Sequence, residues 1–365
     1  MTTAKQSTMQ HPLMFGETRV LFDVIRRYGV ERGLRQKALM MLAGSIATIP
    51  FRQYEKLKYG DLEQQPITQP PLFILGHWRG GTTQLQYLLS QDPQFGYITT
   101  FQMFMPDMMF IGDRVIKPLL ARFTPPTRPI DNLPMHVNLA QEEEYALAAR
   151  SRHAFYHQWI FPRAFRQLRT EYVTFEGDPA NAAAWRRDYL SLMQKVSSYW
   201  HGKPLLIKNP THTARIKTLL DMFPDAKFIN LVRDPYRIFL STRHMYTISR
   251  GIASLHATSD EFIHDMIVDN YQVVMRRYLE QRHLIPADRL IEVRFEDLER
   301  DPANVVKTIY DSLNLPGLNQ ARAPMQRYLD QLGFYQKNKL SMDAALASKI
   351  EQAWGFAFDA WGYER

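Results

Sequence analysis

One stretch of the sequence, residues 71–90, constrains the fold more than any other. Its continuous apolar run from Leu72 to Leu75 is typical of a strand that is buried on both faces. Three glycines follow this run, and the paired threonines Thr82 and Thr83 then precede leucines at helical spacing. This order predicts a strand, a glycine-rich loop and a helix. Such a loop turns backbone N–H groups onto an anion at the N-terminus of the helix, and we expect that anion to be a phosphate.

The loop lacks the lysine of a nucleotide triphosphatase. Gly76 and Gly81 have the spacing of the motif G-x-x-x-x-G-K-[ST], but Thr82 stands at the position of its lysine. The dinucleotide-binding pattern G-x-G-x-x-G is also missing from the sequence. Glycines alone would favour an ordinary turn between a strand and a helix. The two threonines and the neighbouring Arg79 favour a phosphate site instead, though not one for a hydrolysed triphosphate.

Composition narrows the class of function. The chain has 365 residues, 45% of them hydrophobic, enough for one large α/β domain or two smaller ones. It has no cysteine, which excludes disulfides, thiolate metal sites and cysteine nucleophiles. The net charge of +8 is spread along the chain, which favours a small anionic ligand over a nucleic acid. The N-terminus is polar and no apolar run is long enough for a bilayer, so we expect a cytoplasmic protein.

The N-terminal part is predicted to be a helical extension. We expect residues 1–10 to be disordered and residues 11–70, which end in a proline-rich linker, to form this extension. Residues 17–59 have an apolar stripe beside many arginines and lysines. A helix of this kind can lie in a membrane interface, or it can pack on its own domain or on a second subunit. We favour packing, with peripheral membrane contact and a homodimer as the alternatives.

The remaining residues, 71–365, are predicted to form one α/β domain. A second strand is expected within Phe95–Phe104, followed by an irregular apolar insertion over about 103–140 that is long enough to be a substrate lid. Further strands are expected at Leu205–Ile207, Ala226–Val232 and Leu290–Phe295, each followed by a helix. This alternation predicts a doubly wound, mostly parallel sheet flanked by helices in a three-layer sandwich.

Three cations follow predicted strands. These are Arg79, Lys208 and Arg233. Because ligands of such sheets bind beyond the carboxyl ends of the strands, we expect the three side chains to gather there. The sequence contains no H-E-x-x-H motif, and His153 with His157 is an isolated pair, so no metal site is predicted.

Four segments, at residues 77–83, 206–212, 228–241 and 294–302, carry motifs in a recognisable order and spacing. Together they resemble the PAPS-dependent sulfotransferases, most closely their broad bacterial branch with its P-loop-like fold. H-W-R-G-G-T-T (77–83) is similar to the family's 5′-phosphosulfate loop, and F-I-N-L-V-R-D-P-Y-R-I-F-L-S (228–241) to its 3′-phosphate segment. L-I-K-N-P-T-H (206–212) resembles its lysine-containing strand end, and R-F-E-D-L-E-R-D-P (294–302) its acidic element. The first segment departs from the family's usual P-[KR]-S-G-T-T at its tryptophan and its first glycine.

The resemblance implies an enzyme that moves a sulfuryl group from PAPS to a hydroxyl or amine and releases PAP, without a metal. It also implies the residues that bind the donor: Arg79, Gly80, Gly81, Thr82, Thr83, Arg233 and Ser241. Lys337 and Lys339 lie where the family often has a basic loop over the nucleotide, although a solvated loop explains them equally well.

Sulfuryl transfer needs cations and a base. As in phosphoryl transfer, catalysis relies on positioning and on charge stabilisation, here by Arg79 and Lys208. The candidates for the base that deprotonates the acceptor are His77, which lies in the loop itself, and the cluster of three glutamates Glu142, Glu143 and Glu144. We expect one of the glutamates to be the base and His77 to act as a cation. The alternatives are a charged first turn of a helix for the glutamates and a structural hydrogen bond for His77.

The acceptor is expected to be apolar or lipid-like, because the insertion is rich in methionine and phenylalanine and the N-terminal helices are amphipathic. A glycan or a small phenol remains an alternative. Two other functions compete: a P-loop-type kinase for a small metabolite, against which Thr82 argues, and a basic membrane-surface binding protein.

Overall fold

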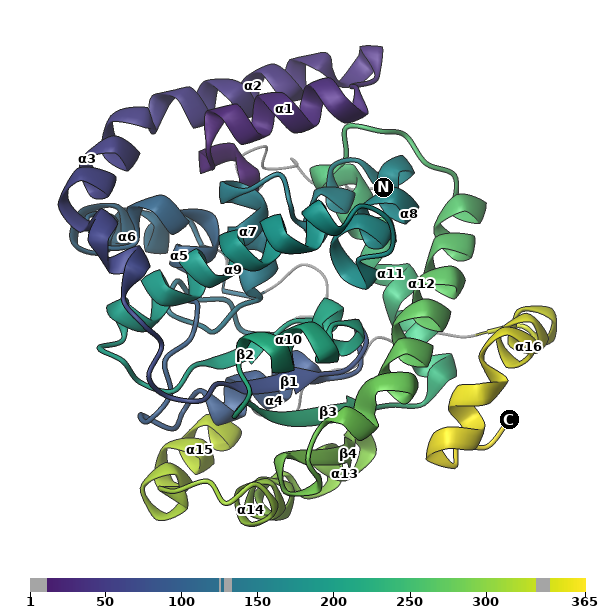
Figure 1. Cartoon of the computed structure of the whole chain (residues 1–365). Coiled ribbons are helices and arrows are strands. Elements are labelled where there is room, and N and C mark those ends of the chain that lie inside the picture. The colour runs from purple at the N-terminus through teal and green to yellow at the C-terminus, as the bar shows by residue number, and fades with distance from the viewer. Residues whose placement is uncertain (1–11, 125, 128–132, 333–341) are drawn as a thin grey trace.

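Four parallel strands form the centre of the molecule (Figure 1). The computed structural model describes residues 12–124, 126–127, 133–332 and 342–365. The strands lie in the order β2-β1-β3-β4, with bounds β1 (Leu72–Leu75), β2 (Leu206–Lys208), β3 (Lys227–Val232) and β4 (Leu290–Arg294). The chain runs from β1 to one neighbour and later returns to the other side of β1. The order therefore reverses between β1 and β3, which is where open parallel sheets bind ligands.

The first strand is central, as its apolar run predicts. Leu72 pairs with Leu206 of β2 on one side and with Lys227 of β3 on the other, and all four residues of β1 are buried. Its side chains alternate between two cores: Phe73 and Leu75 face one, and Leu72 and Ile74 face the other.

Helices cover both faces of the sheet, so the fold is the expected doubly wound α/β sandwich. The core around Leu72 and Ile74 is closed by α4 (Thr82–Leu89), α13 (Phe295–Arg300), α14 (Pro302–Ser312) and α15 (Leu318–Leu332) (Figure 1). The opposite core is closed by α7 (Glu143–Arg150), α9 (Pro179–Tyr199), α10 (Ile216–Met222), α11 (Pro235–Ala253), α12 (Asp260–Gln281) and α16 (Ala344–Trp361).

The expected strand within Phe95–Phe104 is wrong. This segment makes two isolated bridges, Gly96 with Leu205 and Thr99 with Ala140, before it enters the short helix α5 (Thr100–Phe104). The cause is a capping box: the Thr99 hydroxyl accepts from the Gln102 N–H at 3.2 Å, and the Gln102 side chain accepts from the Thr99 N–H at 3.0 Å. These bonds satisfy two N–H groups at the helix start, and the apolar side chains of α5 are buried in the core.

The N-terminal helices pack on the domain. They are α1 (Thr18–Tyr28), α2 (Arg35–Ala47) and α3 (Ile49–Tyr59), and they lie together along one edge of the molecule (Figure 1). Leu21, Val24, Ala38 and Met41 are buried in the same core as one face of the sheet. Among the described helices, none is both long enough and apolar enough to span a bilayer.

The insertion contains helix as well as irregular chain. Its described part includes the short turn Pro106–Met108 and α6 (Gly112–Phe123), and it leads towards α7. Between α7 and α9 lie a 3-10 turn, Phe155–Trp159, and α8 (Phe165–Arg169). The prediction that residues 1–10 are disordered lies outside the described residues.

Candidate active site

The loop after β1 needs glycine at two positions. Gly76 has a φ of 131°, and a Cβ atom there would lie 2.5 Å from the Leu231 carbonyl oxygen. Gly81 has a φ of 93°, and a Cβ atom there would lie 2.0 Å from the ring of Phe295. Both conformations favour glycine, and both sites are closed to a side chain. The loop therefore passes close to β3 and to the end of β4, and α4 begins directly after Gly81 with N–H groups that have no partner within the helix.

Three of the expected donor-binding residues meet at this loop. Arg79 Nε donates to the Ser241 hydroxyl at 2.9 Å, across from α11. Arg233 donates to the Arg79 carbonyl oxygen at 3.0 Å, and its guanidinium lies 4.3 Å from the centre of the Phe295 ring. Arg79 has a φ of 67°, a left-handed conformation that is unusual for a residue other than glycine and that often marks a functional site. Segments separated by more than 150 residues thus build one basic corner.

Lys208 links the loop to the glutamate cluster. It lies at the end of β2, is buried, and donates both to Glu142 and, at 3.2 Å, to the Thr83 hydroxyl at the start of α4. Glu142 also accepts from the Tyr156 hydroxyl, which in turn accepts from the Trp78 indole N–H at 3.1 Å. Trp78 lies in the glycine loop, and Thr83 lies in the first turn of α4, which directly follows that loop. These bonds therefore form a closed circuit around the Glu142 carboxylate.

The circuit holds Tyr156 as a hydrogen-bond donor. Burial, followed by the negative charge of Glu142, raises the pKa of the Tyr156 phenol well above its ordinary value. The phenol therefore keeps its proton and can donate it in a hydrogen bond to the carboxylate at any physiological pH.

The other two glutamates belong to a buried network. Glu143 accepts from the Asn209 side chain at 2.9 Å, and its carboxylate lies 2.8 Å from His212 Nε2. Glu144 forms a two-pronged ion pair with Arg215, with distances of 2.7 and 3.1 Å, and also accepts from the Phe155 N–H. Burial opposes the charge of Glu144, but Arg215, His212 and Asn209 together lower the pKa of this carboxyl. Both side chains therefore hold α7 against the segment after β2 and are closed to solvent.

His77 lies in the interior. Its Nδ1 is 3.0 Å from the Trp78 carbonyl oxygen, its ring contacts Tyr271 edge-on, and its Nε2 has no partner among the described residues. Burial lowers its pKa to about 3. The ring is neutral at physiological pH, which argues against the expected role as a cation.

Of the other residues expected to bind the donor, Gly80 uses its backbone N–H within the loop, and two lysines are not described by the structure. The Gly80 N–H donates to the His77 carbonyl oxygen at 3.0 Å, so this amide closes the turn and is already used. Lys337 and Lys339 lie outside the described residues.

Several residues that build the site are not predicted from the sequence. One is Tyr156, which donates to Glu142. Another is Thr213, whose hydroxyl accepts from the Gly76 N–H at 2.8 Å. Asn209 and Arg215 fix the two buried glutamates. The only available signal was position, since Asn209, Thr213 and Arg215 closely follow the lysine of β2.

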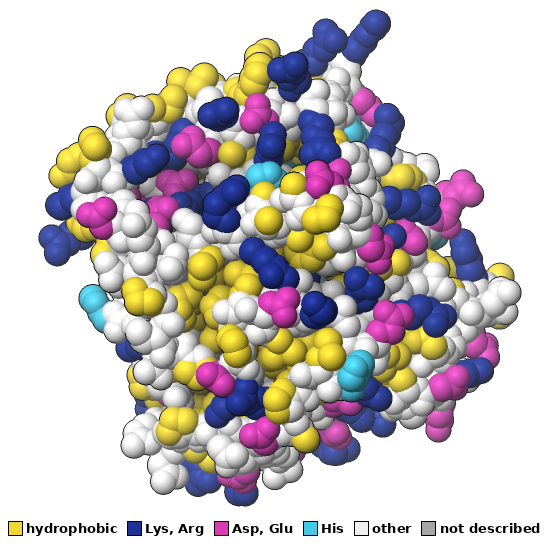
Figure 2. All heavy atoms as spheres, in the orientation of Figure 1, with side chains coloured by type: hydrophobic (Ala, Val, Ile, Leu, Met, Phe, Trp, Pro, Cys, Tyr) yellow, Lys and Arg dark blue, Asp and Glu magenta, His cyan; other side chains and the backbone are white. Residues whose placement is uncertain are grey.

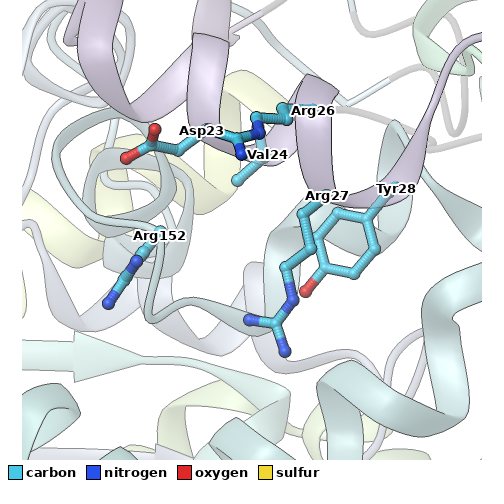
Figure 3. Close-up of a pocket in the computed structure, with 6 residues that line it drawn as sticks. All are labelled: Asp23, Val24, Arg26, Arg27, Tyr28 and Arg152. Atoms are coloured by element: carbon cyan, nitrogen blue, oxygen red, sulfur yellow. The ribbon is translucent and has the colours of Figure 1, made fainter.

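A separate cavity of about 270 Å³ opens beside α1 (Figure 3). Its lining consists of Asp23, Val24, Arg26, Arg27, Tyr28 and Arg152. Arg27 is already bound to Glu171 at 2.6 Å. No residue of the glycine loop lines this cavity, so it is distinct from the site at the strand ends. Among the described residues, no group of three or more potential ligands could hold a metal ion.

A family model for sulfotransferases matches residues 70–320, and the chain belongs to this family. It is therefore an enzyme that transfers a sulfuryl group, and the family implies a donor of the PAPS type.

Curated relatives support the assignment. Over 314 residues the chain is 30% identical to the omega-hydroxy-beta-dihydromenaquinone-9 sulfotransferase Stf3 of Mycobacterium bovis, and equally to that of Mycobacterium tuberculosis. Each alignment covers 86% of this chain and 80% of the relative.

Solved structures support the fold. Sulfotransferase STF1 from Mycobacterium tuberculosis has a TM-score of 0.66 at 18% identity, covering 96% of this chain and 94% of its own. Sulfotransferase STF9 from Mycobacterium avium has a TM-score of 0.67 at 19% identity, covering 96% and 97%. The fold expected from the four sequence segments is thus confirmed.

Proposed function

We propose that the enzyme transfers the sulfuryl group of PAPS to the hydroxyl of a lipid-like acceptor, with Glu142 as the base. The observation that carries this proposal is the Glu142–Lys208 ion pair beside the glycine loop. Of the three glutamates, only Glu142 is partly exposed, and only Glu142 contacts a cation that also touches the loop. This exposure and this contact support Glu142, among these three glutamates, as the carboxylate that an acceptor would meet.

The residues at the strand ends suit the donor. When bound, PAPS supplies a sulfuryl group attached to a phosphate that leaves. The N–H groups at the start of α4, with Thr82 and Thr83, would hold the 5′-phosphosulfate. Arg233 and Ser241, joined through Arg79, would hold the 3′-phosphate, since guanidinium groups bind phosphate oxygens in pairs.

Lys208 and Glu142 then divide the chemistry between them. The new O–S bond forms as the bond from sulfur to the leaving phosphate oxygen breaks. The positive charge of Lys208 stabilises the negative charge that collects on that oxygen. The acceptor proton passes to the Glu142 carboxylate, which Tyr156 orients by donating its own O–H.

An apolar acceptor fits the surroundings of Glu142. Tyr156 packs edge-on against Trp159 at 6.1 Å, and Trp159 stacks on Tyr246 at 4.7 Å. Together with Trp78 these rings form an aromatic wall beside the base. The two Stf3 relatives are named as omega-hydroxy-beta-dihydromenaquinone-9 sulfotransferases. A lipid-like acceptor of that kind is in keeping with such a wall.

The test is an acceptor comparison with purified enzyme and PAPS. We expect sulfuryl transfer to a long-chain prenyl alcohol in detergent and little transfer to a small phenol or a free sugar. Turnover of the small phenol alone would overturn the lipid-like acceptor but would leave sulfuryl transfer intact. Absence of any PAPS-dependent transfer would contradict the proposal as a whole.

The reaction also suggests a place of action. A lipid-like acceptor lies in a bilayer, whereas the nucleotide donor is soluble in water, so the two can meet only at the membrane surface. We therefore propose an enzyme that works from the cytoplasm and contacts the membrane peripherally.

A further inference from the structure

Helix α2 is apolar on two opposite sides. Its inner side carries Ala38 and Met41, which are buried in the core. Its outer side carries Leu39, Met40 and Ile46, which are exposed, Leu39 by 66% of its surface. A surface helix ordinarily has a polar outer face, so an apolar one indicates a partner.

The same surface continues along the next helix. Phe51, Tyr54 and Leu57 recur every three residues on α3 and are exposed, Leu57 by 88%. Val115 and Leu119, one turn apart on α6, are exposed as well. Three helices thus present apolar side chains to solvent.

Buried hydrogen bonds fix α3 to the start of α6. The Glu55 carboxylate accepts from the N–H groups of Met109, Phe110 and Ile111 at 3.0 to 3.1 Å. It is also paired with Lys195 of α9 at 2.8 Å. The segment before α6 is therefore fixed to α3, and both helices are held firmly in the domain.

We call this surface the apolar outer face. It comprises Leu39, Met40, Ile46, Phe51, Tyr54, Leu57, Val115 and Leu119. These are eight of the eleven large hydrophobic side chains that are exposed in the described part of the chain. Figure 2 shows hydrophobic side chains along the edge of the molecule over α2 and α3, with lysines and arginines nearby.

The charge around this face is strongly positive. Residues 18–59 contain nine lysines and arginines against three aspartates and glutamates, a net charge of +6 out of +8 for the whole chain. The excess positive charge therefore lies mostly in this segment, and the expectation that it is spread along the chain is wrong. Arg35, Lys56 and Lys58 are exposed on α2 and α3, and Arg114 is exposed on α6. Apolar side chains bordered by exposed cations are the signature of a segment that lies in the interface of an anionic membrane.

We infer that the apolar outer face docks on an anionic bilayer, with its apolar side chains among the lipid chains and its cations at the headgroups. A second copy of the chain is a poorer partner. A twofold interface would set this face against itself, and two surfaces of the same positive sign would repel each other.

The docked orientation would serve the proposed acceptor. Helix α6 belongs to the insertion that leads to α7 and Glu142, so docking would bring this insertion to the bilayer from which a lipid-like acceptor must come. This part of the inference rests on the proposed function, whereas the docking itself does not.

The test is co-sedimentation of the full chain with vesicles, in the absence of donor and acceptor. One set of vesicles is pure phosphatidylcholine and the other contains about 30% phosphatidylglycerol, with salt at about 0.1 M and about 0.5 M. We expect binding to the anionic vesicles that weakens at high salt. Leu39→Glu combined with Leu57→Glu should reduce this binding by at least about tenfold, because two leucines that would insert among the lipid chains are replaced by charges.

The matched control is Leu190→Glu combined with Leu284→Glu. These leucines are also exposed, by 37% and 41%, but lie on α9 and after α12, and the change in net charge is identical. The control should bind vesicles like the wild type, and all forms should melt at similar temperatures. Equal binding by the two double variants would overturn the inference. So would a wild-type dimer that dissociates on Leu39→Glu with Leu57→Glu and does not bind vesicles.

The outcome is separable from that of the proposed function. PAP-dependent stabilisation and sulfuryl transfer to a detergent-dispersed acceptor do not require vesicles. If the wild type did not bind vesicles but kept both of these properties, only the inferred docking on a membrane would be wrong, and the proposed sulfuryl transfer would stand.

Discussion

Three consecutive glutamates have three different environments. Glu142 stands just before α7 and faces Lys208 and Tyr156, whereas Glu143 and Glu144 are turned into the protein and paired there. The difference follows from the start of α7, because Glu142 is the extended residue before the helix, with a ψ of 124°, whereas Glu143 and Glu144 belong to its first turn. Each residue should therefore respond differently to loss of its charge.

Glu142→Gln should lower turnover by about 10²- to 10⁴-fold, the usual contribution of a general base. Lys208 and Tyr156 remain in place, so PAP affinity should change little. The melting temperature should fall, because the buried Lys208 loses its carboxylate partner. The measurements are turnover with saturating PAPS and PAP binding by calorimetry. Glu280→Gln, an exposed change on α12, is the control and should behave like the wild type. Full activity of Glu142→Gln would move the base elsewhere.

Glu144→Gln should instead affect stability. It leaves the buried Arg215 guanidinium without its carboxylate, and breaking a buried pair in this way costs about 3–5 kcal/mol. The free energy of unfolding in urea, compared with that of Glu280→Gln, measures this cost. A loss below about 1 kcal/mol would show that the pair contributes no more than a surface ion pair does.

At the scale of residues, the sequence predicts the cluster of three glutamates but not which of them meets Lys208. The place of Lys208 after a buried strand was readable from the apolar run that precedes it. Which glutamate meets Lys208 depends on the angle at which α7 approaches the sheet, and Arg215, His212 and Tyr156 together set that angle through contacts that are distant in sequence.

At the scale of elements, the glycine loop supports a direct steric test. Gly81→Ala would place a Cβ atom 2.0 Å from the Phe295 ring, whereas Gly177, with a similar positive φ, has nothing within 4 Å of such an atom. Gly177→Ala should cost only about 1 kcal/mol of backbone strain. Gly81→Ala should cost more and should abolish stabilisation by PAP, because the loop and α4 must shift. Thermal melting with and without PAP measures both effects, and equal behaviour of the two variants would contradict this account of the loop.

The elements themselves were only partly predictable. The strand–loop–helix unit at residues 71–90 was clear because its apolar run, glycines and threonines all favour the same structure. The strand predicted within Phe95–Phe104 is wrong, because Thr99 and Gln102 have the spacing of a capping box and start a helix there. The exposed side of α2 could not be predicted, because both sides of this helix are apolar and hydrophobic periodicity alone does not tell the buried side from the exposed one.

At the scale of the whole molecule, buried histidines should make the fold sensitive to acid. Burial lowers the pKa of His77 to about 3 and that of His157 to about 4, below the ordinary value of 6.5. Between those values the unfolded chain binds protons that the folded chain does not, so stability is lost as the pH falls from about 6.5 towards 4. His157→Gln should flatten this dependence, and His283→Gln, an exposed change, should not. Melting temperatures across this range measure it, and an unchanged slope in His157→Gln would refute the assignment.

The central claim is that the corner formed by the glycine loop, Arg233 and Ser241 is a PAPS site, and thermal melting with PAP in the presence of EDTA tests it most directly. A ligand that binds only the folded chain stabilises it by about 2.7 kcal/mol at a hundredfold excess over its Kd. We predict a clear rise in Tm for the wild type and for Arg300→Ala, an exposed change, and most of that rise lost in Arg233→Ala. An unchanged Tm with saturating PAP, alongside a rise with ATP and magnesium, would contradict the account.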